Sequence, residues 1–312
     1  DISAPKILTK CLRVGNFHPV VSVIVPNYNY APFLDERLSS IYNQTFKEFE
    51  VIILDDASTD DSLAIIEKYR SKPNTSVVLN KVNSGSPFRQ WQKGITAAKG
   101  EIIWIAESDD FSAPDFLALM LPFFNHPEVA LAHCNSNIID ENDNITGDYT
   151  DYHRKLDFNH WKYNYRVKST QEINFGLGVK NSILNVSSVI FRKEAIPPDI
   201  FIKLEAFKFS GDWLFYIELL KGRQIAYCHE KLNFHRRHRQ TLTTQFNSDE
   251  QKKLTLLQEA AKIHARVLDL YELNPQFAEK WKFHIHEQIG AFYPTMKEDE
   301  FNKYYPYDVI NK

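Results

Sequence analysis

The feature of this chain that most limits its fold is an alternation of short apolar runs and helical patterns between residues 20 and 125. Three runs typical of strands buried on both faces are VVSVIV at 20–25, FEVIIL at 49–54 and EIIWIA at 101–106. Between the first two, Leu34, Leu38 and Ile41 recur at helical spacing. Strands that alternate with helices predict an α/β protein with a parallel, doubly wound sheet.

Acidic residues follow two of these runs. Asp55 and Asp56 come directly after the second, and Asp109 and Asp110 come after Glu107-Ser108 at the end of the third. Such sheets bind ligands beyond the carboxyl ends of their strands, so we expect four carboxylates along one edge. Mn²⁺ or Mg²⁺ prefers oxygen ligands and bridges to phosphate oxygens. We therefore predict that Asp109 and Asp110 bind the metal and that Asp56 binds a base or ribose. A helix cap at Asp110 and a turn at Asp56 are the alternatives.

Composition excludes several classes of protein. The net charge is -3 and no long basic block occurs, so no nucleic-acid partner is expected. The chain has neither GxGxxG nor GxxxxGK[ST]. Its three scattered cysteines support no disulfide framework or zinc site, and we interpret them as reduced thiols of a cytoplasmic protein. No signal peptide and no apolar run of about 20 residues is found, so membrane contact is expected to be peripheral.

A long match to one family lies in the same region. The segments VSVIVPNYNY, NQTFKEFEVIILDDASTDDS and AKGEIIWIAESDD occur in the order and spacing of that family. The chain resembles inverting glycosyltransferases of family 2, of the bacterial surface-glycan type. The resemblance implies a GT-A fold, which is a Rossmann-like, mostly parallel sheet flanked by helices. It also implies an acceptor-side α+β part, followed here by C-terminal helices.

The resemblance further implies the roles of individual residues. Donor-binding positions are Pro26, Tyr28, Asp56 and Asp109. In FSGDWLFYIEL, at 209–219, the residue matching the catalytic base is Asp212. A carboxylate there can take the proton of an attacking hydroxyl, and its alternative role is to cap the following helix.

Two further segments supply cations. FHRRHRQTLT, at 234–243, places Arg236, His238 and Thr241 on motif positions, so Arg236 and His238 are expected near the donor diphosphate. His235 stands where the family usually has tyrosine. In NSGSPFRQWQKG, at 83–94, the loop is one residue longer than usual, and Arg89 or Lys93 is expected to face phosphate.

The predicted organisation has four parts. A lead segment covers 1–19, a nucleotide-sugar-binding half 20–125, an acceptor-binding and catalytic half of the same domain 126–248, and a C-terminal helical extension 249–312. Within these parts we also expect a strand over 183–191, and a helix ended by Gly100.

The predicted activity is metal-dependent, inverting, non-processive transfer of one sugar. The donor is a nucleoside-diphosphate sugar of the UDP, dTDP or GDP type, and the acceptor is a hydroxyl of a glycan or lipid-linked molecule. The absence of QxxRW argues against a processive synthase. The alternatives are a nucleotidyltransferase and a non-catalytic nucleotide-sugar or carbohydrate-binding module. The expected location is the cytoplasm, at the inner face of the membrane.

Overall fold

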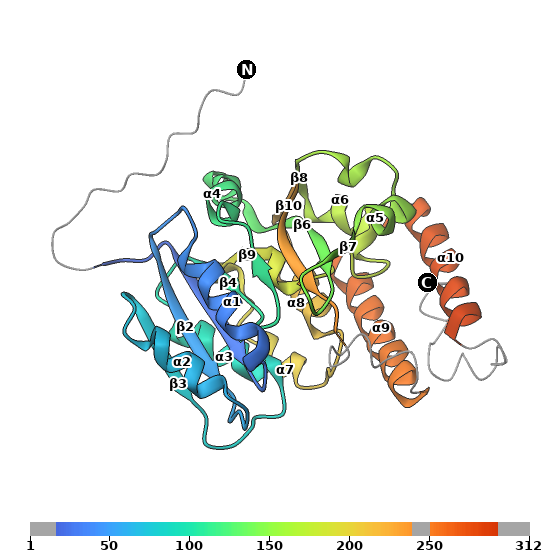
Figure 1. Ribbon diagram of the computed structural model, residues 1–312. Helices are drawn as coiled ribbons and strands as arrows, with labels where there is room; N and C mark the ends of the chain where they lie inside the picture. The colour runs from blue at the N-terminus through green and yellow to red at the C-terminus, as the bar shows by residue number, and fades with distance from the viewer. Residues whose placement is uncertain (1–16, 239–249, 293–312) are drawn as a thin grey trace.

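The structure is a computed structural model that describes residues 17–238 and 250–292 (Figure 1). Its strands are β1 (Val21–Asn27), β2 (Phe49–Asp55), β3 (Thr75–Leu79), β4 (Ile102–Ile105), β5 (Phe111–Ser112), β6 (Val129–Ile139), β7 (Ile145–Asp148), β8 (Tyr165–Lys168), β9 (Val189–Arg192) and β10 (Gln224–Arg236). Its α-helices are α1 (Ala31–Tyr42), α2 (Ser62–Arg70), α3 (Pro87–Ala97), α4 (Phe116–Met120), α5 (Thr150–Leu156), α6 (Ser169–Glu172), α7 (Ile200–Leu204), α8 (Gly211–Leu219), α9 (Glu250–Leu270) and α10 (Pro275–Phe292).

All the strands belong to one sheet, with the central order β3-β2-β1-β4-β9-β6-β10-β5. Strands β3, β2, β1 and β4 are mutually parallel, and β6 is parallel to β10. Strand β9 runs antiparallel between β4 and β6. This mixed, mostly parallel sheet with helices on both faces confirms the predicted fold class.

The alternation of side chains along β1 explains the two layers of helices. Val21, Val23 and Val25 face the core covered by α1, α2 and α4. Ile24 faces the opposite core, which is covered by α3, α7, α8, α9 and α10. Because both faces are covered, β1, β2 and β4 are buried along their whole length.

The predicted C-terminal helical region is two helices, α9 and α10, which lie at the end of the molecule away from α2 (Figure 1). They pack on the body of the protein, where the Tyr271 hydroxyl donates to the Ile217 carbonyl at 2.7 Å. None of the helices in the described part of the chain combines the length and apolarity needed to cross a membrane.

Two local predictions were wrong. Helix α3 ends at Ala97, and Gly100 lies beyond it in a bend. A Cβ at Gly100 would lie 2.6 Å from the Ser22 backbone nitrogen, so glycine is required there by close packing of the backbone. The strand expected over 183–191 is confined to Val189–Arg192, because the preceding residues form a loop and a 3₁₀ turn.

Candidate active site

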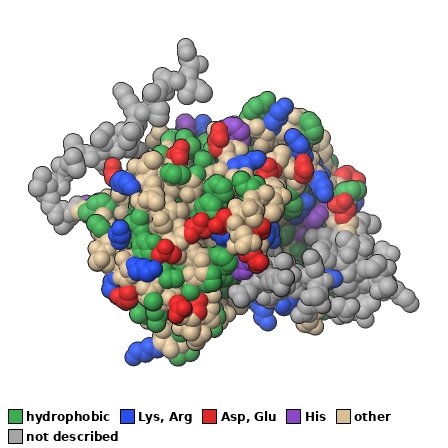
Figure 2. Space-filling view, in the orientation of Figure 1, with side chains coloured by type: hydrophobic (Ala, Val, Ile, Leu, Met, Phe, Trp, Pro, Cys, Tyr) green, Lys and Arg blue, Asp and Glu red, His purple; other side chains and the backbone are tan. Residues whose placement is uncertain are grey.

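The carboxyl ends of β1, β2 and β4 meet at one edge of the sheet and bring the predicted acids together there. Asn27 and Asp55 are register partners in the β1–β2 pair. Residues 107–110 (ESDD) form a turn after β4, called the ESDD turn below. The Ser108 hydroxyl donates to the Pro26 carbonyl at 2.7 Å, which fixes this turn against β1. Acidic side chains gather in the middle of the face shown in Figure 2. Tyr28 is 45% exposed at this edge.

Asp109 and His238 form the central pair of this edge. The His238 Nε2 lies 3.2 Å from the Asp109 Oδ2, although the two residues are 129 positions apart in the chain. The imidazole packs against the rings of Tyr30 and Phe33 at centroid distances of 5.7 and 5.0 Å. The Asp109 side chain keeps 16% of its surface exposed, so it can meet both the imidazole and a bound ligand.

Asp110 has a different environment from its neighbour. It is 2% exposed, and both of its carboxylate oxygens accept hydrogen bonds from the protein. The Arg236 backbone nitrogen donates to Oδ1 at 2.9 Å, and the Asn185 side-chain amide donates to Oδ2 at 2.8 Å. These contacts join β10 and the loop at Asn185 to the ESDD turn. Each oxygen keeps a second lone pair, so the role of Asp110 as a metal ligand stays a prediction.

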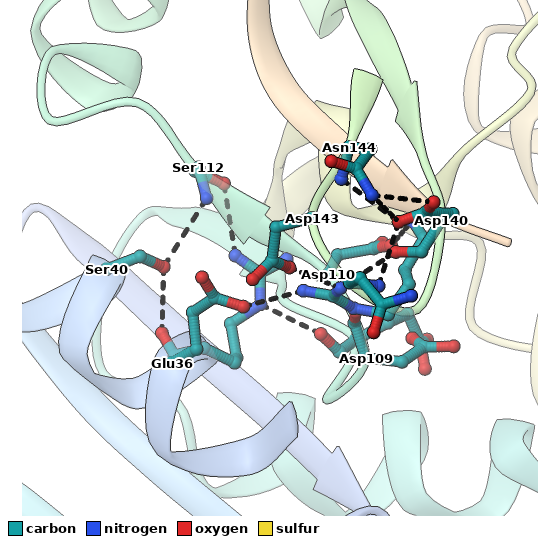
Figure 3. A network of polar contacts seen from close by, with 12 residues as sticks. Glu36, Ser40, Asp109, Asp110, Ser112, Asp140, Asp143 and Asn144 are labelled. Atoms are coloured by element: carbon teal, nitrogen blue, oxygen red, sulfur yellow. Dashed lines mark hydrogen bonds and ion pairs between the residues drawn. The ribbon is translucent and has the colours of Figure 1, made fainter. Parts of the chain in front are cut away.

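Arg236 is also held by the protein. Its side chain is 1% exposed and pairs with Glu36 at 2.6 Å and with Asp143 at 2.5 Å. Its Nε donates to the Asp109 carbonyl at 2.8 Å. Figure 3 shows Glu36, Asp109, Asp110 and Asp143 gathered in this network. With these partners the guanidinium joins α1, the 140–143 turn and the ESDD turn. Its expected place near the diphosphate stays a prediction.

Two residues of this edge were missed as site residues. Glu107 accepts a hydrogen bond from the Trp91 indole at 3.3 Å, and burial, with Asp109 and Asp110 nearby, raises the pKa of Glu107 to about 8. Arg37 is fully buried and donates to the Glu107 carbonyl at 2.8 Å. The sequence does contain a signal for Arg37. It lies on the same side of α1 as Leu34, Leu38 and Ile41, so the helical pattern predicts that this arginine is buried.

Asp56 is surrounded by hydrogen-bond donors from the loop after β3 and from α3. Its oxygens accept from the amides of Asn80 and Gln90 at 2.6 and 2.9 Å. They also accept from the Ser84 backbone nitrogen at 2.9 Å and hydroxyl at 2.7 Å. Asp56 is 5% exposed. The carboxylate therefore anchors this loop, and a base could reach it only in exchange for one of these donors.

Asp212 lies in the first turn of α8, one residue after the helix begins. Its carboxylate accepts from the Trp213 backbone nitrogen at 2.8 Å and from the Asn181 amide at 3.1 Å. Burial raises the pKa of Asp212 to about 6, and the charge of Glu259 raises it as well. Around neutral pH this residue is a carboxylate with an increased affinity for a proton, which is what a general base requires.

The structure does not join every predicted residue to this edge. Arg89 donates to the Ser84 carbonyl at 3.1 Å and lines a separate hollow beside α7. Lys93 contacts the Asn80 side chain. Trp91, whose indole donates to Glu107, is 2% exposed and packs edge-on against Phe215 in the core. Thr241 lies outside the described residues.

Within residues 17–238 and 250–292, no group of three or more His, Cys, Asp or Glu side chains is arranged to hold a metal by itself. Mg²⁺ and related ions that act on nucleotides need only one or two protein ligands, because they keep waters and take further ligands from substrate phosphates. The Asp109 oxygen and the His238 nitrogen fit such an ion, and the nitrogen suits Mn²⁺ better than Mg²⁺.

This fold, with acids along the carboxyl edge of its sheet, defines a glycosyltransferase of the GT-A type. The chain belongs to glycosyl transferase family 2, whose pattern matches residues 22–196.

Particular relatives share parts of the chain. It is 40% identical over 114 residues to the poly(ribitol-phosphate) beta-N-acetylglucosaminyltransferase TarS of Staphylococcus aureus, an alignment that covers 35% of this chain and 20% of TarS. The aligned part is therefore about a fifth of that relative's length.

Two solved structures share the fold. One of TarS with UDP-GlcNAc has a TM-score of 0.66 at 20% identity, covering 93% of this chain and 82% of that one. The mannosyltransferase PcManGT of Pyrobaculum calidifontis, with GDP-Man and Mn²⁺, has a TM-score of 0.52 at 17% identity, covering 94% and 81%.

Proposed function

We propose that this chain transfers one sugar, with inversion and without processivity, from a nucleoside-diphosphate sugar to a hydroxyl of a glycan or lipid-linked acceptor. The observation that carries the proposal is Asp212, a half-buried carboxylate whose pKa is raised to about 6 by desolvation within a chain of this family. As the acceptor oxygen bonds to the anomeric carbon, Asp212 takes its proton. The bond to the diphosphate breaks, and its electron pair leaves with the nucleoside diphosphate.

We place the metal at Asp109 and His238. When bound there, Mn²⁺ or Mg²⁺ supplies positive charge that neutralises the leaving diphosphate. Asp110, Arg236 and Arg37 hold the ESDD turn in place, so that Asp109 faces the donor. The Mn²⁺ in the solved mannosyltransferase supports the choice of ion.

The donor base is the least constrained part of the proposal. TarS was solved with UDP-GlcNAc and PcManGT with GDP-Man, so a UDP-, dTDP- or GDP-type donor remains our proposal for this chain. Hydrolysis of each donor in the presence of Mn²⁺ tests it. Turnover of a sugar nucleotide supports transfer, whereas binding without turnover would favour a carbohydrate-binding module. A cytoplasmic location at the inner membrane face is likewise proposed.

Asp56 gives the first prediction. If Asp56 accepts a hydrogen bond from the base, Asp56→Ala should weaken binding of the matching nucleoside diphosphate about tenfold or more, since such bonds contribute about 1.5–3 kcal/mol. Asn80→Ala removes a competing donor from the same carboxylate and should leave binding equal or tighter. Calorimetry without metal measures both. Equal affinity of Asp56→Ala and wild type would leave Asp56 as a loop anchor alone.

The pH dependence gives the second prediction. Asp212 must be ionised to accept a proton, so kcat should fall about tenfold per pH unit below about 6. Asn181 stabilises the ionised form of Asp212 by donating to Oδ2. Asn181→Ala should therefore move the acidic limb of the kcat–pH profile upward by about one pH unit. Asn142→Ala, an exposed change elsewhere, is the control. A limb that stays at the wild-type pH would remove Asn181 from this role.

A further inference from the structure

A hollow of about 430 Å³ opens between the N-terminal end of α3 and the segment that follows α7. Phe88, Phe201 and Phe207 contribute aromatic rings to its lining, and Arg89 and Lys208 contribute cations. The Lys262 ammonium lies 5.7 Å from the centre of the Phe207 ring. Glu205 is the acidic residue of the lining. Asp109, His238 and Asp212, the residues proposed for the metal and the base, do not line this hollow.

The hollow adjoins the residue that we propose as the base. Phe88 forms part of its wall and packs on the start of α8, where a Cβ at Gly211 would lie 2.3 Å from the Phe88 ring. Glu259 fixes the connecting segment, because it accepts hydrogen bonds from the backbone nitrogens of Lys208 and Ser210 at 2.6 and 2.7 Å. One side chain, Phe88, therefore separates the hollow from the turn of α8 that carries Asp212.

The charges of the hollow are unbalanced. Among the described residues, neither Arg89 nor Lys208 forms an ion pair with a carboxylate, and both side chains are exposed. Glu259, the other nearby acid, is occupied by backbone donors. Exposed cations that have no carboxylate partner attract an oxyanion, and an arginine fork matches its geometry. Aromatic rings beside them suit the C–H faces of a sugar or polyol.

We infer that this hollow is the acceptor subsite and that it takes a glycan chain carrying oxyanions, whose charged group binds Arg89 and Lys208. The inference rests on the proposed transferase function and specifies its acceptor class. The shared chemistry is a phosphodiester or carboxylate group on the acceptor chain. Arg89 is thereby assigned to the acceptor, whereas the sequence alone suggested the donor diphosphate.

Binding of three oligomers of equal length tests the inference on the whole chain: a glycerol phosphate oligomer, a galacturonate oligomer and an uncharged glucose oligomer. The wild type should bind at least one charged oligomer at least about tenfold more tightly than glucose. The double variant Arg89→Gln, Lys208→Gln should lose that difference. Lys72→Gln, an exposed lysine at the end of α2, should retain it. The preferred charged oligomer distinguishes phosphodiester from carboxylate.

Three outcomes would overturn the inference. They are equal binding of charged and uncharged oligomers, unchanged binding in the double variant, and loss of UDP affinity in Arg89→Gln without loss of oligomer binding. Donor hydrolysis is measured separately on the same proteins. Hydrolysis with charge-independent oligomer binding rejects the subsite and keeps the transferase. Charge-dependent binding without any turnover keeps the hollow as an oxyanion-binding site but rejects both the transferase and the acceptor role. Melting temperatures confirm that each variant is folded.

Discussion

Asp109→Asn is expected to lower kcat by at least about 100-fold, because a metal that neutralises a leaving group contributes several kcal/mol to transition-state stabilisation. Asparagine removes the negative charge that binds the ion but preserves the size of the side chain. The affinity for Mn²⁺ in the presence of nucleoside diphosphate should fall in parallel. Asp109 is partly exposed, so the melting temperature should change little.

Two matched variants sharpen this expectation. Asp115→Asn alters an exposed acid that makes no side-chain cap of α4, and it should behave as wild type. Asp110→Asn alters the buried neighbour and should reduce stability by about 1–3 kcal/mol, because one of its two hydrogen-bonded oxygens is replaced by a donor. Steady-state kinetics and thermal melts measure both effects. Full turnover by Asp109→Asn would exclude it from the metal site.

Asp212→Asn is expected to lower kcat by about 10²–10⁴-fold while leaving donor affinity unchanged, because the lost group accepts the proton of the acceptor hydroxyl. The same change should stabilise the protein at pH 8. The folded-state pKa of Asp212, about 6, lies above its unfolded value, so its favourable contribution to stability is lost as the pH rises through about 6. A neutral asparagine avoids this loss.

The stability of Asp212→Asn should therefore depend on pH. At pH 8 relief of the buried charge outweighs one lost hydrogen bond, and we expect a gain of about 1–2 kcal/mol. Near pH 4 the gain should vanish or reverse. Kinetics and melting curves at both pH values make the measurement. Wild-type turnover would remove Asp212 from the mechanism, and a variant unfolded at pH 8 would show that its contacts with Asn181 and Trp213 are structural.

Local pattern predicted much of this protein because the relevant forces act over a few residues. The apolar runs formed buried strands, and Leu34, Leu38 and Ile41 formed the buried side of α1. The acids that follow the second and third runs came to one edge, since parallel strands place their carboxyl ends together. Asp212 opened a helix, as its position before an apolar run suggested.

The roles of adjacent residues were harder to predict. Asp109 and Asp110 are chemically identical and neighbours, and sequence alone treats both as ligands. The tertiary structure separates them, because Asp110 meets Asn185 at a chain separation of 75 and the backbone of Arg236 at 126. Arg236 itself is held by Glu36, 200 positions away, and Asp143, 93 positions away. No local pattern encodes partners at such distances.

The sequence by itself determined the buried strands β1, β2 and β4, the parallel α/β arrangement that they form, and the edge at which the acids lie, since period and propensity are local properties. The tertiary structure decided which acid stays accessible, that Arg236 is buried among carboxylates, and that Arg89 lines an open hollow. Those assignments depend on desolvation and on partners brought by β10 and the Asn181–Asn185 segment. Desolvation and these distant partners arise only when separate parts of the chain pack together.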